Sequence, residues 1–383
     1  MKIALVNHAF SLSHGGLERF SVNLATALHR DGHDVHAFAQ QFRDLPAGVT
    51  EHVLRVPRKP SFLRILGFHR RAARAVGEQT FDVVYGLARF APLDVYRMGD
   101  GVQKHWMRLR YPLAAWRWFN YLINPAHLCN LYLERRILTG SDCRRIVTNS
   151  QLCKEHAQRY YGIPADRIDV VYNGVNHEVF NPESMAARRD AVRRELGLKE
   201  DALAVLHVSN NWRRKGLSVL LRAVSQLGPR GKHVHVIVVG RGRPQPFLKL
   251  ADGLGMAARL HLVGETREVQ KYYAAGDLMV LPTRYDPFSN VCLEAMACGM
   301  AVITTTENGA AELIRVGENG YIQNDPQDAN ELARCLEHCL DRERIEAMGR
   351  KAWKTALPFT REKNMEATLA VFSRLLREKR GER

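Results

Sequence analysis

The chain alternates short apolar, β-branched runs with longer helical patterns, and the same alternation occurs twice. Such runs lie at 3–7, 34–39, 83–85, 145–149 and 168–172, and again at 204–209, 233–239, 260–263, 278–281 and 301–304. Strands that are apolar throughout and are separated by helices form parallel sheets covered on both faces. The pattern therefore predicts an α/β protein with two doubly wound, Rossmann-like domains.

A change of pattern near Asn181 and Pro182 marks the predicted boundary between these domains. The first domain is expected at 1–181, together with a C-terminal helix at about 360–383, and the second at 182–359. A length of 383 residues suits about two domains of ordinary size. Because ligands of open α/β sheets bind at the carboxyl ends of the strands, we expect the site in a cleft across which the domains face each other.

A pair of glycines, Gly15 and Gly16, follows the first predicted strand within the segment 13–19 and begins a helix. Glycines allow the main chain to approach a ligand closely, and the helix N-terminus behind them offers N–H groups to an anion. A tight turn that binds no ligand would have the same sequence.

A basic loop at 212–216 follows the predicted strand that ends at Ser209 and again leads into a helix. Its cations Arg214 and Lys215 suit a diphosphate, whose charge they would neutralise as it leaves. The alternative is a solvated basic loop without a ligand.

The most specific segment is 286–299, which follows the predicted strand 278–281. Asp286 lies in the loop, and Glu294 comes eight residues later inside a helix that Ser289 or Asn290 is expected to cap. Carboxylates accept hydrogen bonds from the paired hydroxyls of a ribose or hexose, while helix amides hold phosphate. For Glu294 alone, a salt bridge within the helix is the alternative.

The net charge of +16 is concentrated between Arg55 and Arg145, where 17 Lys or Arg face 6 Asp or Glu. Arginines and tryptophans alternate in part of this stretch, at Trp106, Arg108, Arg110, Trp116, Arg117 and Trp118. Basic charge with aromatic residues is typical of a membrane-surface or nucleic-acid-binding face. Aromatic packing between helices, covered by arginine stems, is the alternative.

Several classes of protein are disfavoured by what the sequence lacks. The longest apolar run, 118–133, has 16 residues and contains polar ones, whereas a membrane span needs ~20 apolar residues. The apolar start at 3–6 is too short for a secretory signal. The seven cysteines form no CxxC pair or zinc spacing, and no Asp-x-Asp occurs. We expect a reduced, cytoplasmic protein without a metal.

Taken in order, these segments resemble the retaining GT-B glycosyltransferases of the large family, family four, that includes sucrose synthase. The resemblance extends over nearly the whole chain and is supported at 173–175, 239–242, 308–312, Gly317 and Gly320. Within the family, the chain is most similar to the bacterial lipopolysaccharide core α-glucosyltransferases. Their likeness lies in 14–19, 93–96, 99–100 and 214–216.

The resemblance implies donor-binding roles for the matching residues. Gly15 and Gly16 would approach the diphosphate and sugar, Arg214 and Lys215 would bind the diphosphate, and Glu294 would bind the ribose hydroxyls. The donor sugar and phosphates would also meet, largely through main-chain N–H groups, Asp286, Phe288, Ser289, Asn290 and Val291.

The resemblance also implies the reaction. Asp100 would face the transferred sugar and the acceptor hydroxyl, and Asp100, Arg214, Lys215 and Asp286 would be catalytic. A hexose, with glucose as the first candidate, would be transferred with retention of its anomeric configuration. The donor would be a UDP-sugar, and the acceptor a lipopolysaccharide-core or related lipid-linked saccharide. Neither a metal nor any cofactor besides the UDP-sugar co-substrate would be required. Two departures, Asp286 for Glu and Ser289 for Gly, leave another donor sugar open, and Asn308 replaces a further Gly of the family.

The expected partners are a nucleotide sugar, an anionic lipid-linked saccharide and an anionic membrane surface, but no nucleic acid. The protein would be peripheral on the cytoplasmic face of the cell membrane. A GT-B nucleotide-sugar epimerase and a basic nucleic-acid-binding protein are the alternatives. A dehydrogenase is disfavoured because Gln245 stands where the GxGxxG pattern after Gly240 requires glycine.

Overall fold

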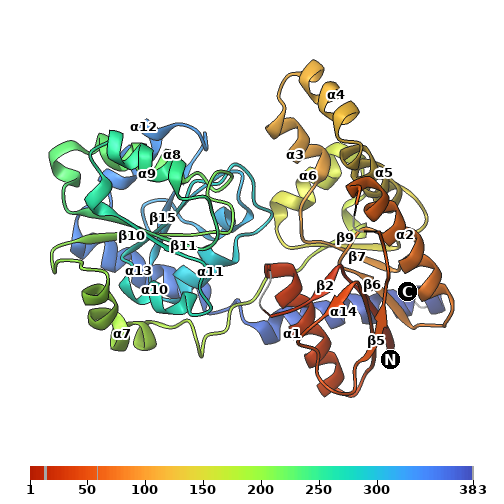
Figure 1. The fold of residues 1–383 in the computed structure, drawn as a ribbon. Helices are drawn as coiled ribbons and strands as arrows, with labels where there is room; N and C mark the ends of the chain where they lie inside the picture. The colour runs from red at the N-terminus through yellow and green to blue at the C-terminus, as the bar shows by residue number, and fades with distance from the viewer. Residues whose placement is uncertain (13–14, 58, 382–383) are drawn as a thin grey trace. The chain divides into compact units, whose positions relative to one another are not determined.

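The computed structural model describes residues 1–12, 15–57 and 59–381. The chain divides into two compact units, Met1–Tyr172 with Asn364–Arg383, and Asn173–Lys363 (Figure 1). The predicted boundary at 181/182 lies inside the second unit, where Asn181 caps α7 (Pro182–Glu195) through a hydrogen bond from the Ser184 amide.

The first unit contains a seven-stranded parallel sheet in the order β5-β3-β1-β6-β7-β8-β9. Its strands are β1 (Lys2–Val6), β3 (Asp34–Ala39), β5 (Thr50–Val53), β6 (Val83–Gly86), β7 (Val95–Met98), β8 (Arg145–Thr148) and β9 (Ile168–Val170). A separate small pair joins β2 (Ala9–Phe10) to β4 (Gln41–Phe42). Consecutive apolar residues make β1 buried on both faces except at its first residue, as a parallel strand requires.

The helices of the first unit are α1 (Gly16–Arg30), α2 (Ser61–Gly77), α3 (Gln103–Arg110), α4 (Ala114–Ile123), α5 (Ala126–Thr139), α6 (Gln151–Tyr161), the short η1 (Ala165–Arg167) and most of α14 (Arg361–Arg380). The last of these, blue in Figure 1, lies among the red and orange elements of the N-terminal sheet. Phe372 of α14 is fully buried and meets Tyr85 of β6 edge-on, with ring centroids 5.1 Å apart. The C-terminal helix therefore completes a core that begins with β1.

The second unit contains a six-stranded parallel sheet in the order β12-β11-β10-β13-β14-β15. Its strands are β10 (Leu203–Val208), β11 (Val234–Val239), β12 (Leu260–Gly264), β13 (Leu278–Leu281), β14 (Ala301–Thr305) and β15 (Gly320–Gln323). The order reverses between β10 and β13, as in doubly wound folds. The prediction of two doubly wound, Rossmann-like sheets is confirmed.

The helices of the second unit are α7, α8 (Leu217–Gln226), α9 (Gln245–Gly253), α10 (Val269–Ala275), α11 (Asn290–Ala297), α12 (Ala329–Glu337) and α13 (Arg342–Ala356), with short turns η2 (Gly228–Gly231), η3 (Ala257–Arg259) and η4 (Gly309–Leu313). In the part of the chain described, none of the helices of either unit combines the length and apolar character needed to cross a membrane.

Candidate functional site

The loops that follow β10 and β13 meet at the strand reversal of the second sheet. The two strands pair directly, so their carboxyl ends lie side by side. Gly216 has φ +80°, and a Cβ there would lie 2.1 Å from the carbonyl oxygen of Pro282. Only glycine therefore permits this contact between the loops, because any other side chain would strike main-chain atoms.

Lys215 and Asp286 come from these two loops and form an ion pair, in which the ammonium donates to the carboxylate. Their side chains are only 10% and 14% exposed. Burial lowers the pKa of Lys215, and the neighbouring Asp286 opposes that shift. Arg214 lies beside them and donates to the carbonyl oxygen of Tyr285 at 3.2 Å. Two cations and one carboxylate therefore leave this loop pair with a positive balance suited to an anion.

The start of α11 presents main-chain donors next to this ion pair. Ser289 is the N-cap residue, as expected, but its side chain makes no capping hydrogen bond. Phe288 and Ser289 are both buried, so their side chains are not available to a ligand. For the amides of Asn290 and Val291, no acceptor is recorded among the described residues. Helix N-termini with unpaired amides attract phosphate.

Glu294, one turn further into α11, is held by a residue that the sequence did not reveal. The phenol of Tyr273 in α10 donates to Glu294 Oε2 at 2.6 Å. Burial and then the charge of Glu294 raise the pKa of Tyr273 well above its ordinary value, so the phenol stays a donor. The ring of Tyr273 packs edge-on against Phe180, with centroids 5.3 Å apart. One carboxylate oxygen is therefore fixed in place.

In the first unit, the glycine pair lies close to the loop that carries Asp100. Gly15 is the N-cap of α1 and Gly16 its first residue, whereas Ser13 and His14 lie outside the described residues. A Cβ on Gly99 would be 3.2 Å from Leu17 Cδ1 in the first turn of α1. The loop after β7 and the start of α1 are therefore neighbours.

Asp100 lies at the edge of a buried polar network. Its side chain is 64% exposed and lies 4.0 Å from Arg89 Nη1. Arg89 also donates to Glu134, a fully buried carboxylate on α5, at 3.4 Å. Glu134 further accepts from the amides that open α3 and from a phenol, namely Gln103 (2.7 Å), Lys104 (3.1 Å) and Tyr161 (2.6 Å). The network therefore fixes the chain just after Asp100, at the start of α3.

Helix α4, at the end of the first unit in Figure 1, has no buried residue. Its large exposed side chains are Trp116 (58%), Trp118 (66%), Phe119 (50%), Leu122 (77%) and Ile123 (63%). At helical spacing these five lie on one face, and Arg117 lies on the other. An amphipathic helix with an uncovered apolar face is typical of proteins that bind membranes at the interface.

The other residues of the predicted membrane face differ from α4 in their surroundings. Trp106 is half-buried, and Arg117 donates to the carbonyl oxygens of Tyr111 (2.9 Å) and Pro112 (3.0 Å). Arg108 and Arg110 are exposed and lie over the rings of Tyr160 and Tyr111 at 5.0 and 5.3 Å. Arg117 therefore ties α4 to the segment that precedes it, whereas Arg108 and Arg110 of α3 are exposed to solvent.

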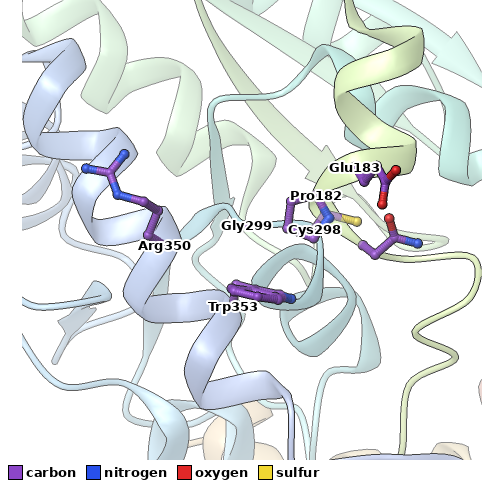
Figure 2. A pocket seen from close by; sticks show the side chains of 7 residues that line it. Pro182, Glu183, Cys298, Gly299, Arg350 and Trp353 are labelled. Carbon is purple, nitrogen blue, oxygen red and sulfur yellow. The ribbon is translucent and has the colours of Figure 1, made fainter.

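A separate pocket of about 500 Å³ lies at the opposite end of α11 (Figure 2). It is lined by Asn181, Pro182, Glu183, Cys298, Gly299, Arg350 and Trp353. Cys298 and Gly299 precede β14, so the pocket is at the amino end of that strand. None of the predicted site residues lines it.

Two family models match the chain in succession. The family described as "Glycosyltransferase Family 4" matches residues 14–179, and that described as "Glycosyl transferases group 1" matches 202–342.

Three curated proteins illustrate the similarity in sequence. An uncharacterized glycosyltransferase of Methanocaldococcus jannaschii is 26% identical over 84% of this chain and 84% of its own length. The lipopolysaccharide glucosyltransferase WaaG of Escherichia coli is 24% identical over 88% of each chain. The D-inositol 3-phosphate glycosyltransferase of Mycolicibacterium smegmatis is 30% identical over 65% of this chain and 56% of its own length.

Two solved structures show the same fold. The crystal structure of WaaG, a glycosyltransferase involved in lipopolysaccharide biosynthesis, has a TM-score of 0.84 with 20% identity and covers 97% of this chain and 99% of that one. The Anabaena protein HepE in complex with UDP-glucose has a TM-score of 0.71 with 21% identity and covers 97% of this chain and all of that one (100%).

Proposed function

The chain belongs to the group 1 glycosyltransferases and has the GT-B fold, and from this premise we propose that it is a retaining, metal-independent hexosyltransferase. The donor would be a UDP-sugar, with glucose the first candidate. The acceptor would be a lipopolysaccharide-core or related lipid-linked saccharide. One observation carries the donor half of this proposal: Arg214, Lys215 and the α11 N-terminus converge where the second sheet reverses its strand order.

The donor would bind along the edge formed by these loops. The diphosphate would contact Arg214, Lys215 and the amides of Asn290 and Val291, and the ribose hydroxyls would donate to Glu294. A diphosphate would draw Lys215 from its partner Asp286, leaving that carboxylate to accept from sugar hydroxyls. The name of HepE's complex with UDP-glucose supports a nucleotide sugar of this kind.

In the proposed reaction, the bond between the sugar's anomeric carbon and the diphosphate oxygen breaks. The acceptor hydroxyl oxygen forms its bond to the same carbon on the same face, and its proton passes to the leaving diphosphate. Arg214, Lys215 and the helix amides stabilise the charge that develops on that diphosphate. Asp100, which lies 4.0 Å from Arg89, would orient the transferred sugar and the acceptor hydroxyl.

Because this chain's own cations would neutralise the diphosphate, we expect transfer to continue in EDTA. Complete loss of transfer on chelation, restored by Mg²⁺ or Mn²⁺, would contradict the metal-independent mechanism.

The uncovered face of α4 and the exposed arginines of α3 support an acceptor presented at a membrane. The protein would then work as a peripheral enzyme on the cytoplasmic face, where nucleotide sugars are available. The +16 net charge would favour an anionic surface.

A screen of nucleotide sugars by thermal shift, followed by NMR of the anomeric carbon in the product, tests the proposal. The acceptor panel includes lipopolysaccharide core saccharides and inositol phosphate, because one relative is named for that acceptor. We expect stabilisation by a UDP-sugar and a product of retained configuration. An inverted product would refute the mechanism, and interconversion of nucleotide sugars without transfer would favour an epimerase.

The site assignment has its own test in Lys215→Ala and Glu294→Ala. Both should abolish measurable donor binding, because each removes a charged group at the proposed contact surface. Lys271→Ala is the matched control, since Lys271 pairs with Glu195 on the surface of the same unit. Donor binding at the wild-type level in either site variant would remove that residue from the site.

A further inference from the structure

Asn308 follows β14 and is almost completely buried, with 1% exposure. Its Oδ1 accepts from the amides of Ser289 and Ala310, both at 3.1 Å. Its Nδ2 donates to Thr304 Oγ1 at 2.8 Å and to Cys292 Sγ at 3.6 Å. A side-chain amide has two donor hydrogens and two acceptor lone pairs, so every hydrogen-bonding position of Asn308 is occupied.

These contacts join the start of α11 to the ends of two strands. Ser289 is the N-cap of α11, and the Thr304 hydroxyl in turn donates to the carbonyl oxygen of Leu281, the last residue of β13. Main-chain hydrogen bonds reinforce the link at Asp286, whose N–H donates to Glu307 O (2.9 Å) and whose carbonyl accepts from Gly309 (3.0 Å). The loop 282–289 is therefore held by the side chain of Asn308 and by main-chain hydrogen bonds.

The bond to Ser289 has a consequence for ligands. An amide at a helix N-terminus is ordinarily available to an anion, but that of Ser289 is already paired with Asn308. The next two amides, of Asn290 and Val291, have no recorded acceptor among the described residues. Their direction is set by the helix that Asn308 anchors.

We infer that Asn308 is a positioning residue for the donor diphosphate, which aims the Asn290 and Val291 amides without touching the ligand itself. This inference rests on the proposed function. The physical basis is preorganisation, because a loop fixed before binding loses less conformational freedom when the ligand arrives. The same position carries glycine in the family that the sequence resembles, and glycine has no side chain with which to do this.

The matched control is Asn319, a second buried asparagine of the same unit, also 1% exposed. Its Oδ1 accepts from the Arg315 amide (2.7 Å), and its Nδ2 donates to Leu313 O (3.0 Å) and Thr355 Oγ1 (3.1 Å). Its own carbonyl pairs with Val302 near the amino end of β14, away from the loop 282–289. Truncating Asn319 should therefore destabilise the unit without altering the start of α11.

The experiment compares Asn308→Ala and Asn319→Ala with the wild type by calorimetric titration of UDP and by NMR titration of uridine, after thermal melts have shown folded protein. Uridine lacks phosphate, so it reports on the remainder of the site. We expect Asn308→Ala to raise the Kd for UDP about tenfold, which corresponds to about 1.4 kcal/mol, while the Kd for uridine stays within about twofold. Asn319→Ala should change neither Kd.

Other results have definite meanings. Equal weakening of UDP and uridine binding by Asn308→Ala, or an unchanged Kd for UDP, would overturn the inference and leave Asn308 a structural residue. If Asn308→Ala does not fold, the same titrations are made with Asn308→Gly, since the family that the sequence resembles has glycine at this position. Failure of the wild type to bind UDP at all would count against the proposed function rather than against Asn308.

Discussion

The apolar face of α4 yields a quantitative prediction for membrane binding. Trp118 and Leu122 are four residues apart and point the same way, with 66% and 77% of each residue exposed. Full burial of a large apolar side chain contributes about 1.5 to 3 kcal/mol, so lipid would gain about 1.5 kcal/mol from each of them at these exposures. Replacing both by glutamine should lower the partition coefficient roughly 100- to 200-fold, the equivalent of about 3 kcal/mol.

The assay is co-sedimentation with vesicles of phosphatidylcholine, with and without phosphatidylglycerol, at low and high salt. The control Leu248→Gln changes a leucine of α9 that is 45% exposed in the other unit, and it should bind as the wild type does. Salt should weaken binding to anionic vesicles through Arg108 and Arg110, while the effect of the double substitution persists at every salt concentration. Wild-type partitioning of the double variant would refute a lipid role for α4.

Three further predictions concern the folded units and the donor site. His207 is fully buried, donates through Nδ1 to Val280 O at 3.0 Å, and has its pKa lowered to about 4 by burial. As the pH falls, the imidazole of the unfolded chain is protonated before that of the folded chain. The contribution of His207 to the free energy of unfolding is therefore fully present above pH 6.5 and falls by about 3 kcal/mol as the pH drops to 4. Urea unfolding of His207→Asn should show a smaller loss of stability over this pH range. Tyr273→Phe removes the donor to Glu294 and should raise the Kd values of UDP and uridine alike, by roughly tenfold in calorimetric or NMR titrations, for a hydrogen bond to a charged group; unchanged affinity for both would dissociate Tyr273 from the site. Phe372→Ala should cost about 3 to 5 kcal/mol in urea unfolding, and limited proteolysis should then cut first within residues 1–172; early cuts in the other unit would contradict the placement of α14.

Apart from β7, the sequence predicted the interior strands of both sheets, because those strands are mostly apolar on both faces. It missed β7, where the pattern is broken by Arg97, a residue only 2% exposed. Its guanidinium lies over the ring of Phe20 at 4.2 Å, and this tertiary contact lets an arginine occupy a core strand. The edge strands β5 and β15 were missed as well, although the other two edge strands, β9 and β12, were predicted. β5 is largely exposed and so has no apolar run, and β15 has only four residues.

For the candidate site, the rule that ligands bind at the carboxyl ends of strands predicted Lys215 and Asp286 on loops that follow strands. That these two loops are neighbours depends on the strand order, in which β10 pairs with β13. The ion pair between them was not predicted, since it depends on how closely Gly216 lets the loops approach. Tyr273 and Asn308 were missed as functional candidates for a similar reason. Each acts through a hydrogen bond to a residue of a different element, and such a contact cannot be predicted from the spacing of residues along the chain.

The return of α14 to the first unit affects the order in which the protein can mature during synthesis. Residues 364–383 leave the ribosome after the whole of the second unit, yet Val371, Phe372 and Leu375 belong to the core around β1. The N-terminal unit therefore cannot bury this apolar surface until α14 has been synthesised. Domains usually fold one after another from the N-terminus. In this chain the second unit is complete in sequence first, so the earliest-made part of the molecule is the last to close its core.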